Sequence, residues 1–364
     1  MRIGKIAIES RNIPIVFAVN LLCGFLFYLP ILALYFEKEL FSAANVAIIF
    51  SVEAIACVIF EIPTGAIADL FGRKKTMILD HIVMLCGLLL LYIGGSMIMF
   101  ILYAVCFAFA RSLASGTYTA MIYDSLQEEN KERYFKEIVG VYQALWPAGA
   151  SLGSIIGGYL AATSLQLTVS ATFIPIILAL VLSFFTKEPQ YEKAGHKNIL
   201  HHMMNTSKFV ITNRQLIVIL SVAFIMVGIG ESMHLLSPIF FKFKELPIEY
   251  FGWIMALIFG FSSLGFFLSH DISKRIGDKK TLILVTILSP LFLITATLLS
   301  KIPLVIFWTS ASLFFGIKNP IFDHLINREV HSSKRATVIS IHNFTGQLGV
   351  AIIAPLYGYF ADLY

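Results

Sequence analysis

Charged residues inside long apolar stretches are the first candidates for chemistry in this sequence. Glu53, Arg111 and Glu231 each lie far from the polar ends of such a stretch. A charge near the centre of a bilayer costs ~2.5–3.5 kcal/mol on insertion scales, so it should face protein or water and have a partner. A carboxylate there can take up and release a proton, which favours Glu53 and Glu231 as proton carriers. His234 shares a helix face with Glu231, and its default interpretation is a core residue. Lys318 is either a further intramembrane charge or a cation that extends to the cytoplasmic boundary.

A second group of charges separates two apolar stretches at residues 61–76, EIPTGAIADLFGRKKT. Gly72 permits a tight reversal of the chain there. The three consecutive cations at 73–75 would anchor the turn on one side of a membrane. The segment is therefore either a solvated loop between helices or a part of a moving assembly. We expect Asp80, early in the following helix, to pair with these cations.

The composition is that of an all-α integral membrane protein. Of the 364 residues, 58% are hydrophobic and only 13% are charged, and the mean hydropathy is +0.82. A soluble core of this size does not need so much apolar surface, whereas a bilayer does. The net charge of +5 comes from short clusters and is no nucleic-acid footprint. The four cysteines lack metal-ligand spacing, and no phosphate-binding loop or Ser/His/Asp order appears, so we expect neither a metal site nor an enzyme.

The apolar stretches predict the topology. Eleven of them approach the ~20 residues that a membrane-spanning helix needs, at 13–36, 43–68, 76–94, 97–121, 137–162, 166–186, 215–240, 249–270, 281–300, 302–324 and 336–360. If successive loops alternate between two sides, only four of the 27 lysines and arginines fall on the second side, namely Lys38, Lys242, Lys244 and Lys301. This bias predicts a cytoplasmic N-terminus and a cytoplasmic central linker. No cleavage site follows the basic N-terminus, so we expect the first helix to be retained.

Three short motifs recur at matching points of this topology. GRKKT at 72–76 recurs as GDKKT at 277–281, IYDSL at 122–126 as IFDHL at 321–325, and GGYLA at 157–161 as YGYFA at 357–361. The nearly constant offset indicates two copies of a six-helix unit. We predict a first bundle over 1–186, a linker with an interfacial helix over 187–214, and a second bundle over 215–364. Twelve spans would complete the pair, and eleven are visible.

The halves, the linker and the turn at 61–76 together resemble the major facilitator superfamily (MFS). The segment GAIADLFGRKK fits the loop signature of that family, and SGTYTAMIYDSL, at 115–126, is similar to the fourth-helix ending of small bacterial drug-efflux-type permeases. The resemblance covers essentially the whole chain. It implies two pseudo-symmetric six-helix bundles that enclose a central cavity.

The resemblance also implies a cytoplasmic gate at this turn, formed by Asp69, Gly72, Arg73 and Asp124. Asp69 would lie near a helix N-terminus of the other half, where the helix dipole favours an anion. Arg73 would pair with Asp124 at the end of helix four. These contacts would keep the outward-open state closed on the inside.

Helix five is similar to that of the antiporters of the superfamily. Its glycine frame is complete at Gly140, Gly149, Gly153, Gly157 and Gly158, while Ser154 replaces the signature proline. The frame favours an exporter, and close helix packing is the alternative. The resemblance further links an arginine in helix four to proton coupling. Arg111 lies in that helix, and a structural ion pair is its alternative role.

The sequence as a whole predicts a secondary active transporter that works by alternating access. We expect proton-coupled efflux of amphiphilic or cationic compounds, with no cofactor and the proton gradient as the energy source. Uptake of a metabolite, a non-transporting receptor with the same fold and coupling to Na⁺ are the alternatives. The expected partners are a small-molecule substrate and the lipid bilayer, without nucleic acid. The expected state is a monomer in the plasma membrane, with a dimer as the alternative.

Overall fold

The computed structural model describes the backbone of residues 2–3, 6–7, 9–189, 213–329 and 332–363. Side chains are not described at 2–3, 6–7, 62–63, 65–70, 214–215, 219, 223, 323–329, 332–337 and 339–340. The described part of the chain is helical, apart from a short antiparallel pairing of β1 (Arg2–Ile3) with β2 (Ile6–Ala7). This confirms the predicted all-α membrane fold.

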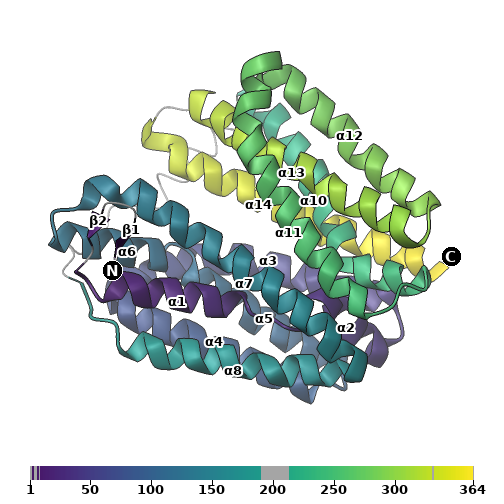
Figure 1. Ribbon diagram of the computed structural model, residues 1–364, viewed down its shortest axis with the longest axis horizontal. Helices are drawn as coiled ribbons and strands as arrows, with labels where there is room; N and C mark the ends of the chain where they lie inside the picture. The colour runs from purple at the N-terminus through teal and green to yellow at the C-terminus, as the bar shows by residue number, and fades with distance from the viewer. Residues whose placement is uncertain (1, 4–5, 8, 190–212, 330–331, 364) are drawn as a thin grey trace.

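The helices form two groups that follow one another along the chain (Figure 1). The first group comprises α1 (Asn12–Gly24), η1 (Leu29–Ile31), α2 (Leu32–Leu40), α3 (Ala43–Phe71), α4 (Arg73–Ile93), α5 (Met97–Ala114), α6 (Thr117–Glu128), η2 (Glu132–Tyr134), α7 (Phe135–Thr163) and α8 (Leu165–Phe184). The second comprises α10 (Arg214–Phe243), α11 (Glu249–Ile276), α12 (Asp278–Leu298), α13 (Lys301–Glu329) and α14 (Ser332–Leu363). We call these groups the N half and the C half.

The helices agree with the predicted spans. Within the described residues, ten segments are long and apolar enough to cross a membrane. They correspond to ten of the eleven predicted stretches. The other stretch, 137–162, lies in the 29-residue helix α7, which is not among these ten segments.

Two predicted helices are interrupted. The first span breaks at residues 25–28 between α1 and η1, and the backbone N–H of Phe27 donates to Thr172 Oγ1 at 3.2 Å instead of to a helical carbonyl. The fourth span breaks between α5 and α6 at Gly116, whose φ of +78° is a left-handed conformation that favours glycine. The hydropathy pattern predicted each of these spans as one continuous helix.

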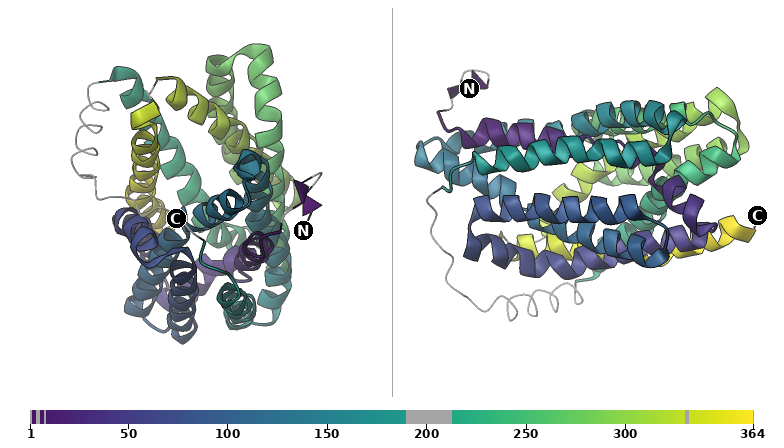
Figure 2. Two further views of the ribbon diagram at one scale, coloured as in Figure 1. Left: turned by 90° about the vertical axis from the view of Figure 1, so that its left-hand side faces the viewer. Right: turned by 90° about the horizontal axis from the view of Figure 1, so that it is seen from below.

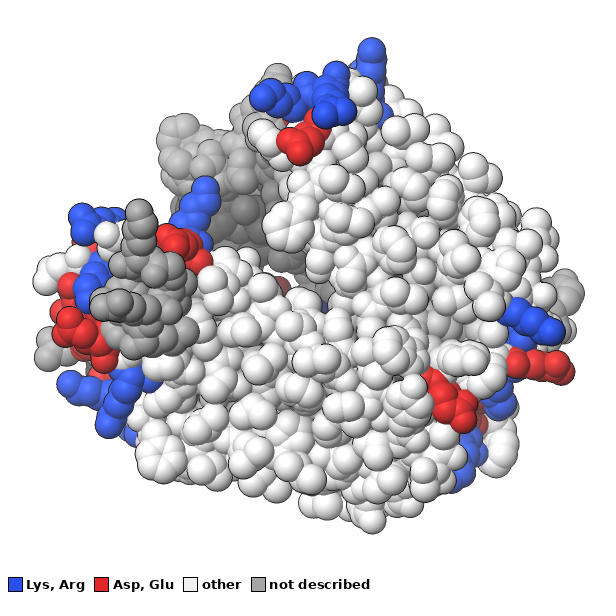
Figure 3. All heavy atoms as spheres, in the orientation of Figure 1, with Lys and Arg blue, Asp and Glu red and all other residues white. Residues whose placement is uncertain are grey.

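The most extensive contacts between the halves are those of α3 with α14 and of α7 with α11. The helices α4, α8 and α12 lie at the periphery (Figures 1 and 2). Charged side chains gather at the two ends of the face in Figure 3, and the band between them is uncharged. One end carries the N-terminus and the turns at Gly72, Asn130 and Gly277, and we call it the basic end. The opposite end carries the turns at Phe41, Gly94 and Lys244.

Candidate functional site

A cavity of 680 Å³ lies between the two halves. The space-filling view shows the molecule hollowed between the halves (Figure 3). Helices of both halves line the cavity, and its lining includes all three sequence-predicted proton-coupling candidates, Glu53, Arg111 and Glu231. The three residues are far apart in the sequence, and the fold brings them to one cavity between the two helix bundles.

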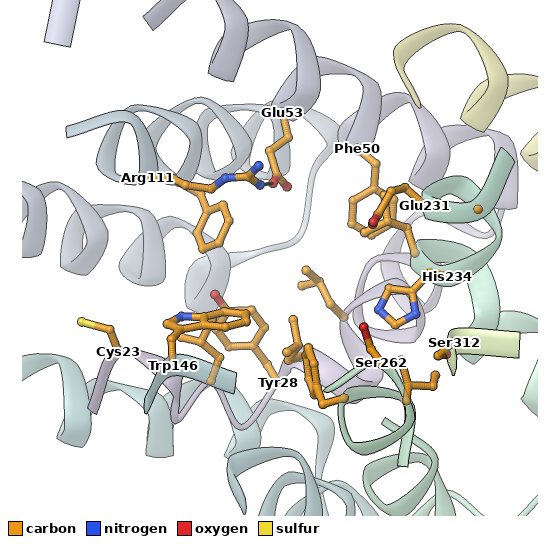
Figure 4. Close-up of a pocket in the computed structure, with 18 of the residues that line it drawn as sticks. Cys23, Tyr28, Phe50, Glu53, Arg111, Trp146, Glu231, His234, Ser262 and Ser312 are labelled. Carbon is orange, nitrogen blue, oxygen red and sulfur yellow. Dashed lines mark ion pairs between the residues drawn. The ribbon is translucent and has the colours of Figure 1, made fainter. Parts of the chain in front are cut away.

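Arg111 and Glu53 form an ion pair on the N-half wall of the cavity (Figure 4). Arg111 projects from α5 and Glu53 from α3, and Arg111 Nη1 lies 3.7 Å from Glu53 Oε1. The Arg111 side chain is 54% exposed, whereas that of Glu53 is 16% exposed. The partner that a cation at this depth requires is therefore Glu53, which the sequence had suggested only as a separate proton carrier. Their roles in coupling remain predictions.

Glu231 and His234 lie across the cavity on α10 (Figure 4). Among the residues that the structure describes, no hydrogen bond or ion pair joins the Glu231 carboxylate to another side chain. Glu231 is therefore an acid of the cavity that is available to a ligand or a proton. His234 lines the cavity, which the default interpretation of a core residue did not anticipate.

Lys318 on α13 is buried, with only 4% of its surface exposed. Its Nζ lies 4.7 Å from the centre of the Phe315 ring and 5.9 Å from that of Phe322. Such cation–π contacts partly replace the lost hydration of an ammonium group. Burial contradicts the interpretation of Lys318 as a cation that extends to the membrane boundary.

Aromatic side chains close the cavity between these charged groups. Trp146 of α7 and Phe259 of α11 meet edge to face across the two halves, with ring centres 6.0 Å apart. Tyr28 lies in the break of the first span, where its hydroxyl accepts from Tyr103 at 3.2 Å. Flat aromatic faces suit an apolar body, and they also attract organic cations.

The turn at the basic end is held within the N half. Arg73 Nε lies 3.5 Å from Asp124 Oδ2, so the predicted contact is present. Glu188 accepts from the backbone N–H groups of Arg73 at 2.6 Å and Lys74 at 2.9 Å, and it thereby caps the N-terminus of α4. Gly72 permits this approach, because a Cβ there would lie 2.8 Å from the Glu188 carboxylate.

The predicted Arg73–Asp124 pair lies within one half of the molecule. The two residues are paired while the halves stand apart at the basic end (Figures 1 and 3). Their contact therefore cannot by itself hold the halves together. The side chain of Asp69, the proposed link to the other half, lies outside the described residues. Its role in a gate remains a prediction.

Four of the five helix-five glycines lie at close backbone contacts. Gly149, Gly153 and Gly157 face the end of α1 and the break that follows it, and a Cβ on Gly153 would lie 3.0 Å from Phe25 Cα. Gly158 faces α11 of the other half, where a Cβ would lie 2.8 Å from the carbonyl oxygen of Glu249. Close packing thus explains these four positions. Nothing lies within 4 Å of a Cβ on Gly140.

The prediction for Asp80 is wrong. Its carboxylate accepts from the Tyr118 hydroxyl at 2.6 Å and lies 3.7 Å from His81 Nδ1, while Arg73 pairs with Asp124. Tyr118 follows Asp80 in the sequence by 38 residues, so helix packing, and no local pattern, brings the pair together.

Comparison with known proteins identifies the family. The Major Facilitator Superfamily, as a sequence family, matches residues 15–355. The chain belongs to this superfamily. It is also similar to YxaM of Bacillus subtilis (strain 168), an uncharacterized MFS-type transporter, with 24% identity over 344 residues that cover 90% of the chain and 84% of YxaM.

Solved transporter structures have a similar fold. A mutant of the nucleoside transporter NupG superposes with a TM-score of 0.84 at 14% identity, over 97% of this chain and 92% of NupG. An inward-facing, unoccupied bacterial homolog of the human lysosomal transporter Spinster gives 0.75 at 16% identity, over 97% and 82%. At these identities the likeness shows the fold. As a member of the superfamily, the chain is a membrane transporter, as the resemblance predicted.

Proposed function

We propose that the protein is a proton-coupled exporter of amphiphilic or cationic compounds. The observation that carries the proposal is the Glu231 carboxylate, which faces the cavity without a hydrogen bond or ion pair to another side chain among the described residues. Across the cavity, Arg111 is paired with Glu53. An acid in an apolar cavity needs a counter-charge, and either a proton or a cationic ligand supplies one. The aromatic walls supply contacts for the apolar body of such a ligand.

The same geometry supports a transport cycle. We place the basic end in the cytoplasm, because the lysines and arginines concentrate there. The structure then corresponds to an inward-open state in which cytoplasmic substrate can reach Glu231. Rocking of the N half (1–186) against the C half (215–364) about the cavity would expose the site to the outside. Protons from the outside would neutralise Glu231 and Glu53, displace the cation, and leave to the cytoplasm after the return.

Protonation of Glu53 has a further consequence in this cycle. It removes the charge that holds Arg111, which lies 3.7 Å away. The freed guanidinium would then repel a cation in the cavity. Binding of substrate and binding of protons thereby exclude each other, which is the requirement for antiport.

The proposal is tested by proton release in everted membrane vesicles that are acidified inside. Addition of a substrate such as a quaternary ammonium dye should release luminal protons, and Glu231→Gln should abolish the release for cationic compounds. Glu132→Gln is the matched control, because Glu132 is an exposed glutamate of η2 outside the cavity. Proton release by Glu231→Gln at the wild-type rate would contradict the proposal.

Uptake of a polar metabolite is the second candidate. Hydroxyl groups of Ser262, Ser289 and Ser312 line the C-half wall, and they could bind a polar solute. The fold similarity to NupG, a nucleoside transporter, is compatible with such a solute. Intact cells decide between the candidates, because an importer accumulates its substrate and an exporter excludes it.

We further propose a monomer in the plasma membrane with its N-terminus in the cytoplasm. One chain lines the whole cavity, so a second copy is not needed to build the site. Coupling to H⁺ rather than Na⁺ would appear in the vesicle assay as insensitivity to replacement of Na⁺ by K⁺.

A further inference from the structure

A buried polar cluster in the N half is not used by the proposed cycle. It joins Asp80 and His81 of α4 to Tyr118 of α6 and Cys23 of α1. Asp80 is 8% exposed, His81 1% and Tyr118 4%. Three of the four, Cys23, Asp80 and Tyr118, also line the central cavity. The cluster is thus a branch of the cavity, toward the basic end.

The hydrogen bonds of the cluster place a proton on one nitrogen of His81. His81 Nδ1 lies 2.5 Å from the backbone carbonyl oxygen of Met77, so this nitrogen carries a proton and donates it. His81 Nε2 lies 3.6 Å from Cys23 Sγ and can accept from the thiol. A neutral His81 satisfies both contacts. Asp80 then receives one strong hydrogen bond, from the Tyr118 hydroxyl at 2.6 Å.

The buried Asp80 carboxylate therefore receives fewer hydrogen bonds than it could accept. A carboxylate can accept several hydrogen bonds and is costly to bury without a paired cation. The titratable groups that face Asp80 are His81 from its own helix, Cys23 from α1 and Tyr118 and Tyr142 from α6 and α7. No lysine or arginine forms an ion pair with it among the described residues.

We propose that Asp80, positioned by Tyr118 and His81, is a further proton-binding site of the transporter, in addition to Glu53 and Glu231. It lies seven residues from the start of α4, or about two helical turns from the basic end. A proton that leaves Glu53 or Glu231 in the inward-open state would pass through the cavity to Asp80 and then to cytoplasmic water. The proton is only transferred, and no bond other than O–H forms or breaks. The inference rests on the proposed function for its place in the cycle.

The decisive experiment compares proton-driven transport with substrate counterflow, which needs no net proton movement. Asp80→Asn preserves the shape and can still accept from Tyr118, but it cannot bind a proton. We expect proton-driven transport to fall about tenfold or more while counterflow remains, since a positioned proton-transfer group contributes at least that much. Asp271→Asn is the matched control, because Asp271 is an exposed aspartate of α11.

Two further variants separate proton binding from packing. Tyr118→Phe removes the hydrogen bond and leaves the carboxylate, so it should shift the pH profile of transport without abolishing the coupling. If Asp80 and Tyr118 had only a structural role, Tyr118→Phe and Asp80→Asn would each lower proton-driven transport and counterflow together. Wild-type coupling in Asp80→Asn would also overturn the proposal.

A direct titration keeps this inference separate from the proposed function. The infrared band of protonated carboxyl groups is followed against pH in the purified wild type and in Asp80→Asn. A band that is present in the wild type and lost in the variant supports the site, even if no compound drives proton release in vesicles. Identical spectra would overturn it, whatever the vesicles show.

Discussion

The two ends of the molecule use the same capping device in different ways. At the basic end, Glu188 accepts from the backbone N–H groups of Arg73 and Lys74, which begin a helix of its own half. At the opposite end, Asp362 of α14 caps the first residues of α3 in the other half, with Ala43 N at 2.7 Å and Ala44 N at 3.0 Å. Ser42 Oγ donates to the same carboxylate at 2.6 Å. Glu188 therefore stabilises the N half alone, whereas Asp362 joins the two halves.

In the proposed cycle, the two caps would behave differently. Contacts at the Glu188 cap can persist throughout a rocking motion, because both partners move together. Contacts at the Asp362 cap must break when the opposite end opens. An N-terminal cap stabilises a helix by typically ~1 kcal/mol. A contribution of this size favours the state in which the opposite end is closed, and it still allows that end to open.

Glycine contacts reinforce the closed end symmetrically. Gly158 of α7 faces α11, and Gly358 of α14 faces Ala44 of α3, where a Cβ would lie 2.7 Å from Ala44 Cα. These two glycines occupy equivalent positions in the repeated motifs GGYLA and YGYFA. The internal repeat therefore places a small residue at each of the two most extensive helix contacts between the halves.

The largest effect is expected from Gly158→Val. The new side chain would meet the backbone of Glu249, which cannot move aside as a flexible side chain could. Overpacking of this kind costs about 1–3 kcal/mol, and here it acts only on the closed end. Spin labels at Glu39 and Ile302, both exposed at that end, should move apart in double electron–electron resonance.

Gly140→Val is the matched control for that experiment. It changes another glycine of the same helix and the same motif, but its side chain would enter open space. The label distance should remain that of the wild type. An equal change in both variants would mean that general distortion of α7, rather than the cross-half contact, opens the end.

Asp362→Ala should have the next largest effect. It removes an acceptor for two backbone donors across the halves, and the loss of a cap costs ~0.5–2 kcal/mol. The closed end should lose population by roughly 2- to 30-fold, as measured with the same pair of labels. Glu188→Ala, the corresponding change at the basic end, should lower the melting temperature and leave the label distance unchanged. A shift of the labels in Glu188→Ala would refute the distinction between the two caps.

The sequence predicted features that depend on composition and repetition. The number and order of the long helices, the turn at Gly72 and the contact between Arg73 and Asp124 all follow from local patterns or from resemblance. The need of Arg111 for a partner followed from the cost of an unpaired charge in a membrane. These features are determined within a segment or within a repeat.

The features that the sequence did not predict depend on how helices rotate against each other. Neither the Asp80–Tyr118 hydrogen bond nor the Asp362 cap can be deduced from spacing, because each joins different helices. The break at residues 25–28 also depends on contacts between helices. The glycines of α7 pack against the irregular backbone of this break, and a continuous helix would hold that backbone in another position. Burial of Lys318 likewise follows from packing around Phe315 and Phe322.

Arg73→Ala and Asp124→Ala test the basic end with a smaller effect. The two side chains are 14% and 12% exposed and 3.5 Å apart, so their interaction is partly shielded from water. The double variant should lose no more transport than either single variant, because the pair acts as a unit. Since both residues lie in one half, the label distance at the opposite end should not change. Strictly additive losses of transport would show that the two residues act independently.

The smallest effect is expected for the ion pair that joins the halves at the surface of the closed end. Lys242 Nζ lies 2.9 Å from Glu37 Oε2, but the lysine side chain is 62% exposed. Exposed pairs contribute only about 0.2–1 kcal/mol and are screened by salt. Lys242→Ala should therefore change the label distribution slightly at low ionic strength and not at 0.5 M KCl, a condition under which the Debye length is below ~8 Å. A large, salt-independent shift would mean that this charge pair, rather than the Asp362 cap and the glycine contacts, holds the opposite end closed.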